Sequence, residues 1–386
     1  MGLVVAEAPN GGWDRDRRLW WLLWAGCPGL GWVSLRGIEM HFGSLAAAWR
    51  APMSGFPSLS GPRGNWRRAV EDWRDRWGAE PLARWSQSST LGRCALLPGD
   101  VALPPSLNDL ARPPLALFWK GRGSLWPHLR RRAAVAVVGT RRPSRHGEAM
   151  AEAVGRALAQ AGWPVISGLA DGIDGASHRG CLAQGGSPIA VLGTSLDRVY
   201  PSHHAQLQHQ VAELGLLISE QPQGTPIRPG HFAARNRLLV QLASAVVLVE
   251  CPEQSGALHS ARLAQQEQLP LWVVPSDAAR PSSRGSNRLL AQGARVLLEP
   301  SELIRHLGQG PLAPRSPTPV PDSSDKLRLP VVPEDAHLLS ALADGACLEQ
   351  LSQQLQLPLS WVAQRLLALE LQGQVRAEPG LHWRRV

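Results

Sequence analysis

Residues 133–308 constrain the fold most strongly, because short apolar runs alternate there with helical patterns. The runs are continuously apolar, which is typical of strands that are buried on both faces of a sheet. Repeated strand–helix units predict an α/β fold with a doubly wound, Rossmann-like and mostly parallel sheet. The predicted strands are 133–138, 164–166, 189–192, 216–218, 245–249, 271–274 and 296–298, with an entry strand at 115–119.

The 386 residues leave room for two or three domains. Residues 13–92 are predicted to be helical, and 12 of the 16 tryptophans precede residue 131. The Pro28–Gly31 turn between two helices predicts a domain of the SAM or helix-hairpin-helix type. Such a turn can direct N–H groups at a phosphate, although a plain helical bundle with tryptophan in its core is the simpler interpretation. The Rossmann-like domain is placed at 100–308.

Residues 309–334 form a predicted Pro-rich linker, and residues 335–386 a predicted winged helix with three helices and a terminal hairpin. Its third helix offers Gln364, Arg365 and Glu370 as polar groups. Residues 301–386 carry 8 basic and 9 acidic side chains, so we expect this domain to contact protein rather than to read duplex DNA.

The formal net charge of +9 favours a phosphate-bearing or otherwise anionic partner. The five cysteines are scattered and form no CxxC pair, which excludes a disulfide scaffold or a zinc ribbon. No apolar run reaches the ~18 residues of a membrane span. The first residues lack the pattern of a signal peptide. A cytoplasmic protein with no membrane partner is therefore expected.

Glycine and hydroxyl side chains follow several predicted strands, where parallel sheets bind ligands. Arg141 adds a charge after the first strand, and the N-terminus of the next helix, expected from Ser144 to Ala161, suits a phosphate. A basic segment at 224–237 reaches the same edge. The predicted DNA- or phosphate-binding residues are Gly139, Thr140, Arg141, Ser167, Gly168, Gly193, Thr194, Arg228, Arg235, Asn236, Arg237, Ser255, Gly256, Asn287 and Arg288.

Other site chemistries find less support. The first turn is not GxGxxG, and GxxxxGK[ST] is absent, which argues against NAD and against a P-loop ATPase. No cofactor, metal or catalytic residue is predicted. Asp174 and His178 share a helical face and are interpreted as a capping carboxylate paired with an imidazole. Residues His203, His204 and His209 lack zincin spacing and a clear carboxylate partner, and are interpreted as surface or phosphate-proximal groups.

Six blocks resemble, in order and spacing, the DNA-processing protein A family, also called DprA or Smf. They are VVGTRRPSRHG, VISGLADGIDGASHRG, IAVLGTSLDRVYP, LLISEQPQGTPIRPGHFAARNRLL, VVLVECPEQSGALHSARLA and SRGSNRLLAQGA. The resemblance implies a non-enzymatic protein that binds single-stranded DNA, forms homodimers through the Rossmann-like domain and loads RecA recombinase during natural transformation. It assigns DNA contacts to Gly139, Thr140 and Arg141, and to the Arg235–Arg237 segment.

Two positions depart from the family pattern. Asp171 stands where the family commonly has Lys or Arg, which would weaken a phosphate contact, and Gln221 replaces the usual aromatic residue. Two other classes stay open. A nucleotide-hydrolysing enzyme of the phosphoribohydrolase type would carry a PGGxGTxxE block, which is absent, and a protein adaptor would keep a vestigial pocket.

Overall fold

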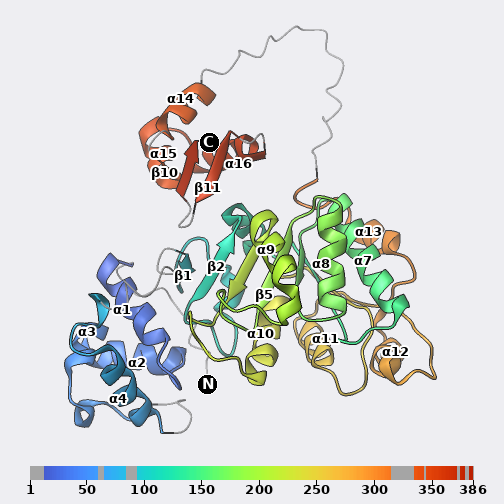
Figure 1. Cartoon of the computed structure of the whole chain (residues 1–386). Coiled ribbons are helices and arrows are strands. Elements are labelled where there is room, and N and C mark those ends of the chain that lie inside the picture. Colours follow the sequence, from blue (N-terminus) through green and yellow to red (C-terminus); the bar gives the residue numbers. More distant parts are fainter. Residues whose placement is uncertain are drawn as a thin grey trace.

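A computed structural model describes residues 13–59, 65–83, 94–313, 334–342, 345–371, 374–378 and 382–385. Their main feature is a nine-stranded sheet flanked by helices (Figure 1). Its order is β1-β2-β6-β5-β4-β3-β7-β8-β9, and pairing from β6 to β9 is parallel. The strands are β1 (Ala95–Leu96), β2 (Leu117–Gly121), β3 (Val135–Val138), β4 (Val165–Ser167), β5 (Pro188–Leu192), β6 (Leu216–Ser219), β7 (Ala245–Leu248), β8 (Leu271–Val273) and β9 (Arg295–Val296).

The doubly wound, Rossmann-like prediction is confirmed. Each predicted strand overlaps an observed one. The continuous apolar runs mark strands that are buried on both faces, apart from β9, whose two residues are exposed. Two features of the sheet edge were not predicted. The entry strand β2 pairs antiparallel with β6, and the short β1 adds a further antiparallel edge. The sheet therefore begins at Ala95, ahead of the boundary expected at residue 100.

Helices cover both faces of this sheet. One face packs against α6 (Trp126–Arg130), α10 (Pro229–Gln241), α11 (Gly256–Gln266) and α12 (Arg284–Ala291). The other packs against α7 (Arg145–Gln160), α8 (Ile173–Ala183), α9 (Ala205–Leu214) and α13 (Pro300–Leu307). The α7 bounds agree with the prediction, and the Ser144 hydroxyl accepts a hydrogen bond from the Gly147 N–H as its N-cap.

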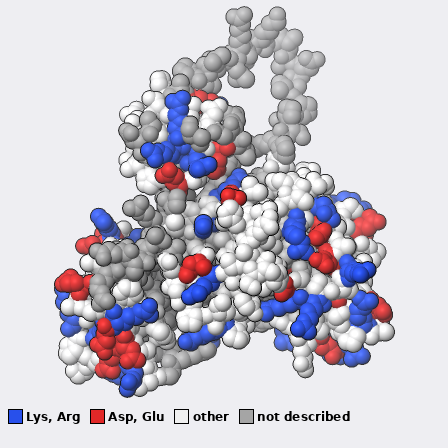
Figure 2. Space-filling view, in the orientation of Figure 1, with Lys and Arg blue, Asp and Glu red and all other residues white. Residues whose placement is uncertain are grey.

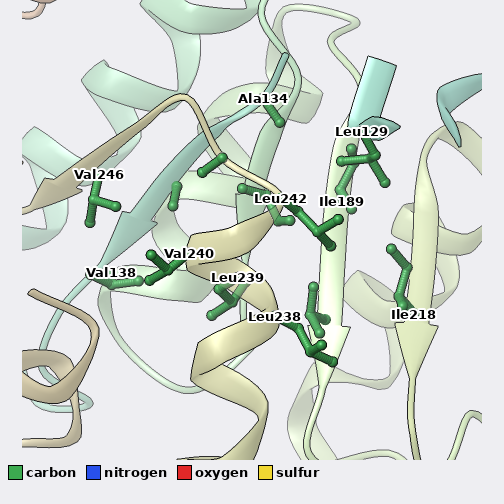
Figure 3. Close-up of a cluster of buried hydrophobic side chains, with 14 of the residues drawn as sticks. Leu129, Ala134, Val138, Ile189, Ile218, Leu238, Leu239, Val240, Leu242 and Val246 are labelled. Atoms are coloured by element: carbon green, nitrogen blue, oxygen red, sulfur yellow. The ribbon is translucent and has the colours of Figure 1, made fainter. Parts of the chain in front are cut away.

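The C-terminal half of α10 forms part of the main core. Figure 3 shows Leu238 and Leu242 directed toward the strands that carry Ile189 and Ile218, with Leu239 on the neighbouring side of the helix. All five side chains are buried. This packing fixes α10 against the sheet, so the polar first turns of the same helix are held at the carboxyl ends of the strands.

The N-terminal helices are α1 (Arg15–Ala25), α2 (Trp32–Phe42), α3 (Leu45–Arg50) and α4 (Trp66–Trp77). Trp21 and Trp24 are fully buried, which confirms the core interpretation of these tryptophans. Trp21 also donates its indole N–H to the Leu115 carbonyl at 2.8 Å, and Arg18 pairs with Asp100 at 2.9 Å. These contacts join the helices to the entry segment of the sheet. Residues 84–93 lie outside the described residues.

The C-terminal elements are α14 (Glu334–Ala341), β10 (Ala346–Cys347), α15 (Leu348–Leu355), α16 (Leu359–Leu371), β11 (Val375–Glu378) and β12 (His382–Arg385). Their strands pair antiparallel in the order β10-β12-β11, around a core that includes Trp383. Arg365, expected as an exposed polar group, forms an ion pair with Asp335 of α14. The winged-helix assignment stays a prediction, and most of the predicted linker, residues 314–333, lies outside the described residues.

Candidate nucleic-acid interface

The candidate site lies where the strand order reverses, between β3 and β7. Ligands of open α/β sheets bind at the carboxyl ends of strands on either side of such a point. The Thr140 N–H donates to the Glu250 carbonyl at 2.7 Å, which closes the turn after β3 onto the end of β7. A β-carbon at Gly139 would lie 2.9 Å from that carbonyl oxygen, so this approach requires glycine.

The N-terminus of α7 does not offer the open phosphate site that the sequence predicts. The Glu250 carboxylate accepts hydrogen bonds there from the Ser144 N–H at 3.0 Å and from the Ser144 hydroxyl at 2.7 Å. Glu250 is 1% exposed, so a buried negative charge already satisfies this helix end. An added phosphate would meet that charge. The anion site must therefore be sought closer to the exposed side chains of the turn.

Arg141 projects from the same turn and lies against an aromatic pair. Its guanidinium carbon lies 5.2 Å from the ring centroid of Phe232, on α10. The Phe232 ring in turn lies 5.0 Å from the ring of Tyr200, which is 40% exposed. Arg141 itself is exposed. We call these three residues the Arg141 shelf; it combines a positive charge with accessible aromatic faces.

Two buried charged side chains, Arg235 and Asp174, lie beneath the shelf in the protein interior. Arg235, also on α10, is 5% exposed and donates to the Val191 carbonyl. Asp174, 6% exposed, accepts from the Gly168 N–H at 3.1 Å. Burial raises the pKa of Asp174, and the nearby Arg235 charge opposes that rise. Burial lowers the pKa of Arg235 to about 10, so the guanidinium stays charged at neutral pH.

Two arginines predicted to contact phosphate have internal roles in this structure. Arg235 is too deeply buried to reach a ligand at the surface. Arg237 forms a two-pronged ion pair with Glu220, with N–O distances of 2.7 and 2.5 Å, and also donates to the Arg112 carbonyl. Its guanidinium is therefore paired at the end of β6, and its assignment as a phosphate contact stays a prediction.

The other predicted residues fall into two groups. Near the shelf, Gly193 contacts the Phe232 ring, Arg228 is exposed at the start of α10, and the hydroxyls of Ser167 and Thr194 donate to the carbonyls of Val137 and Arg198. The second group lies farther from the shelf. Asn236 donates to the Gly256 carbonyl, Ser255 caps α11, and Arg288 pairs with Glu253. The Asn287 side chain accepts a hydrogen bond from the Ser276 N–H and donates one to the Ser276 carbonyl. The second group flanks β7 and β8, on the other side of the reversal point.

Two histidine interpretations change. Asp174 does not cap α8, because it accepts from the N–H groups of Gly168 and Ala170, which precede the helix, and the N-cap is Gly172. Among the described residues neither ring nitrogen of the buried His178 has a hydrogen-bond partner, so the expected pairing with Asp174 is absent. His203, interpreted as lacking a carboxylate, lies 2.7 Å from Asp171. The two are 32 residues apart, so no local spacing could reveal the contact.

Charged side chains are distributed unevenly over the face in Figure 2. Lysine and arginine side chains lie along the lower border, near α10 and α11, and also on the right, near α7, α8 and α12, where acidic side chains are mixed with them; the surface around α9 is largely uncharged. The lower border is the side toward which the parallel strands point in Figure 1. Part of the cationic surface thus lies on the edge that carries the Arg141 shelf.

A doubly wound sheet with a cationic, aromatic shelf at its reversal point defines a Rossmann-like protein suited to a polyanionic ligand. The family model described as DNA recombination-mediator protein A matches residues 95–308. Protein Smf of Synechocystis is 30% identical over 96% of this chain and 99% of its own length. The chain belongs to the DprA/Smf family, which confirms the resemblance of the six sequence blocks.

Two further matches agree with this assignment. Protein Smf of Escherichia coli is 35% identical over 74% of this chain and 76% of its own length. The X-ray structure of DNA processing protein A from Streptococcus pneumoniae superposes with a TM-score of 0.61 and 25% identity, covering 76% of this chain and 98% of that chain. Among the described residues, no helix has both the length and the apolar character needed to cross a membrane.

Proposed function

We propose that this protein binds and protects single-stranded DNA along the carboxyl edge of its sheet, and loads RecA recombinase onto it during natural transformation. The Arg141 shelf carries the proposal. Arg141 offers a cation for a phosphate, and Phe232 and Tyr200 offer faces on which bases can stack. Charge combined with stacking is the general means by which proteins hold single strands.

The shelf favours single strands over duplex for a geometric reason. Tyr200 is 40% exposed and Phe232 is half-buried, so their rings present limited faces close to the surface. Bases of a duplex are already stacked and paired, and reaching these rings would require unpairing them. An unpaired strand presents its bases without that cost. The arginines of this edge then contribute binding that is independent of sequence and sensitive to salt.

Family membership supports the wider role. Relatives in Bacillus subtilis and Streptococcus pneumoniae carry the name DNA processing protein DprA. We extend DNA processing to this chain, as a cytoplasmic homodimer that meets RecA, and assign it no catalytic step. A nucleotide-hydrolysing enzyme or a protein adaptor would behave differently in the same assay.

Fluorescence anisotropy with labelled oligo-dT, duplex competitor and a salt series tests the proposal. We expect tight binding that duplex competes for poorly, with log affinity falling by about 0.7 per contacted phosphate for each tenfold rise in salt. RecA assembly on the bound strand and light scattering of the free protein then test loading and dimerisation. Failure to bind at low salt would overturn the proposal in favour of an adaptor, and turnover of a nucleotide would favour an enzyme.

A further inference from the structure

Three side chains with metal-binding atoms converge beside the shelf. Asp171 lies in the turn after β4, and His203 and His204 lie in a short 3-10 helix, η5 (Ser202–His204). One ligand atom from each residue lies within 4.8 Å of the other two. The Asp171 Oδ1 atom is 2.7 Å from His203 Nε2 and 3.7 Å from His204 Nε2. No other feature of the described residues brings two imidazoles and a carboxylate together.

The orientation of His204 leaves one nitrogen without a protein donor. Its Nδ1 lies 3.1 Å from the Leu169 carbonyl oxygen, so Nδ1 carries the hydrogen and donates it. In the neutral ring, Nε2 then holds a lone pair that faces the Asp171 carboxylate. Two electron-rich atoms directed at each other call for a cation between them. A ligating histidine held through its other nitrogen by a backbone carbonyl is the usual arrangement in metal sites.

We propose that Asp171, His203 and His204 bind a divalent transition-metal ion, with Zn²⁺ as the expected occupant. Two imidazoles and one carboxylate match zinc sites that keep a further position open to water or to another ligand. Mg²⁺ and Ca²⁺ prefer oxygen ligands, so two imidazoles disfavour them.

Distances and burial are compatible with this ion. Zinc bonds of 2.0–2.1 Å in a tetrahedral site place neighbouring ligand atoms about 3.3 Å apart. The observed separations of 2.7 and 3.7 Å from Asp171 lie on either side of that value. The His204 side chain is 8% exposed, whereas those of Asp171 and His203 are 42% and 64% exposed. One ligand is therefore fixed in the interior, and the open coordination position faces solvent.

The ion would change the sign of the charge next to the shelf. With neutral histidines the cluster carries −1 from Asp171, and a bound divalent ion makes it +1. The cluster is close to the turn that holds Arg141, because the following residue, Gly172, is packed so tightly against Thr140 that a β-carbon would lie 2.5 Å from its carbonyl oxygen. A phosphate oxygen at the open position would then bind both the metal and the shelf. This link to DNA rests on the proposed function, whereas metal binding does not.

Zinc binding is measured on the full chain, purified without a histidine tag and stripped with a chelator. A chromophoric zinc indicator competes for the ion, and Co²⁺ absorption reports the ligand geometry. We expect one tight equivalent of Zn²⁺, and an affinity at least about tenfold lower in Asp171→Asn and His203→Gln. His203 is exposed and Asp171 is half-buried in a turn, so these variants should fold, and circular dichroism checks that they do.

His209→Gln is the matched control. His209 is exposed on α9 and lies 3.3 Å from Glu213, so it is a histidine–carboxylate pair that lacks a second histidine. The tight equivalent should persist in this variant. Zinc binding by Asp171→Asn and His203→Gln that equals the parent protein would overturn the site. So would the absence of a tight equivalent in the parent, which would leave a simple Asp171–His203 hydrogen bond.

The link to DNA is tested separately with oligo-dT. Zn²⁺ should tighten binding by the parent protein and leave Asp171→Asn unaffected, while metal-free Asp171→Asn should bind more tightly than the metal-free parent. Zinc that binds at the cluster without changing DNA affinity would overturn the link. Absence of DNA binding in every condition would overturn the proposed function, and the zinc titration, run without DNA, would still decide the metal site.

Discussion

The guanidinium of Arg235 lies against the backbone of Gly168, in the space that a β-carbon on residue 168 would occupy. That guanidinium also donates to the Val191 carbonyl, so α10 and the ends of β4 and β5 meet at one buried cation. A small residue at 168 is required here because of this contact, and not because of a ligand. The Arg141 shelf depends on the arrangement, since Phe232 is carried by the same helix.

Gly168→Ala should destabilise the protein by about 1–3 kcal/mol, because the methyl group forces Arg235 out of its position. Urea unfolding followed by tryptophan fluorescence measures the change. Gly230→Ala is the matched control. It lies in the first turn of α10 with no atom within 4 Å of an added β-carbon, and should be neutral or slightly stabilising. Equal stability of Gly168→Ala and the parent would show that Arg235 can relocate freely.

Arg141→Ala should weaken oligonucleotide binding equally for all sequences, since a phosphate contact carries no base information. The slope of log affinity against log salt should fall by about 0.7, the value for one phosphate of a single strand. Anisotropy titrations with oligo-dT and a mixed sequence test this. Arg131→Ala makes the same charge change at an exposed position before β3, at the opposite edge of the sheet. An equal loss in that variant would mean that net charge alone drives binding.

Tyr200→Leu should weaken single-strand binding by about 1–3 kcal/mol, the range found when a stacking aromatic side chain is removed. Tyr200→Phe keeps the ring beside Phe232 and should bind like the parent protein. The comparison separates stacking from a hydrogen bond of the phenol group. If Tyr200→Phe loses as much affinity as Tyr200→Leu, the hydroxyl and not the ring makes the contact.

Alkylation should divide the five cysteines into two groups. Burial raises the pKa values of Cys27, Cys181 and Cys251 to about 12. A raised pKa keeps the thiol protonated at pH 8, where roughly one molecule in ten thousand would carry the reactive thiolate. Iodoacetamide followed by peptide mass spectrometry should therefore modify Cys94 and Cys347, which are half-buried, first. Fast modification of Cys181 in the folded protein would contradict its burial in the core.

The sheet could be predicted from sequence because its parallel strands are continuously apolar. The direction of β2 could not be predicted, since the residues of Leu117–Gly121 do not indicate whether the strand pairs parallel or antiparallel. β1 has two residues, too few for a pattern. The position of β2 depends on its pairing with β6, a contact across about 100 residues of chain, and β1 pairs in turn with β2.

The sequence predicted two parts of the candidate site, namely the turns at the carboxyl ends of the strands and the position of Arg141 after the first strand. The stacking of Phe232 with Tyr200 was missed, because it joins a helix to a loop 32 residues earlier. The role of Arg237 depends on Glu220 across a loop, and a run of arginines does not show which member is neutralised. Glu220 directly follows β6, and this acidic residue was the available signal. Asp171 was recognised as unusual, but its histidine partners appear only in three dimensions.

The core shared by the N-terminal helices and the sheet has a consequence for how this protein can be divided. Buried side chains of α1 belong to the same cluster as Phe118, Leu192 and Leu217 of the sheet. The family match begins at residue 95, yet a fragment cut there would expose this apolar face to water. The segment that the family model matches is thus smaller than the segment that must be kept to bury this apolar face. A shortened version of this protein, whether designed or evolved, would therefore need polar residues in place of the apolar sheet residues that the N-terminal helices cover.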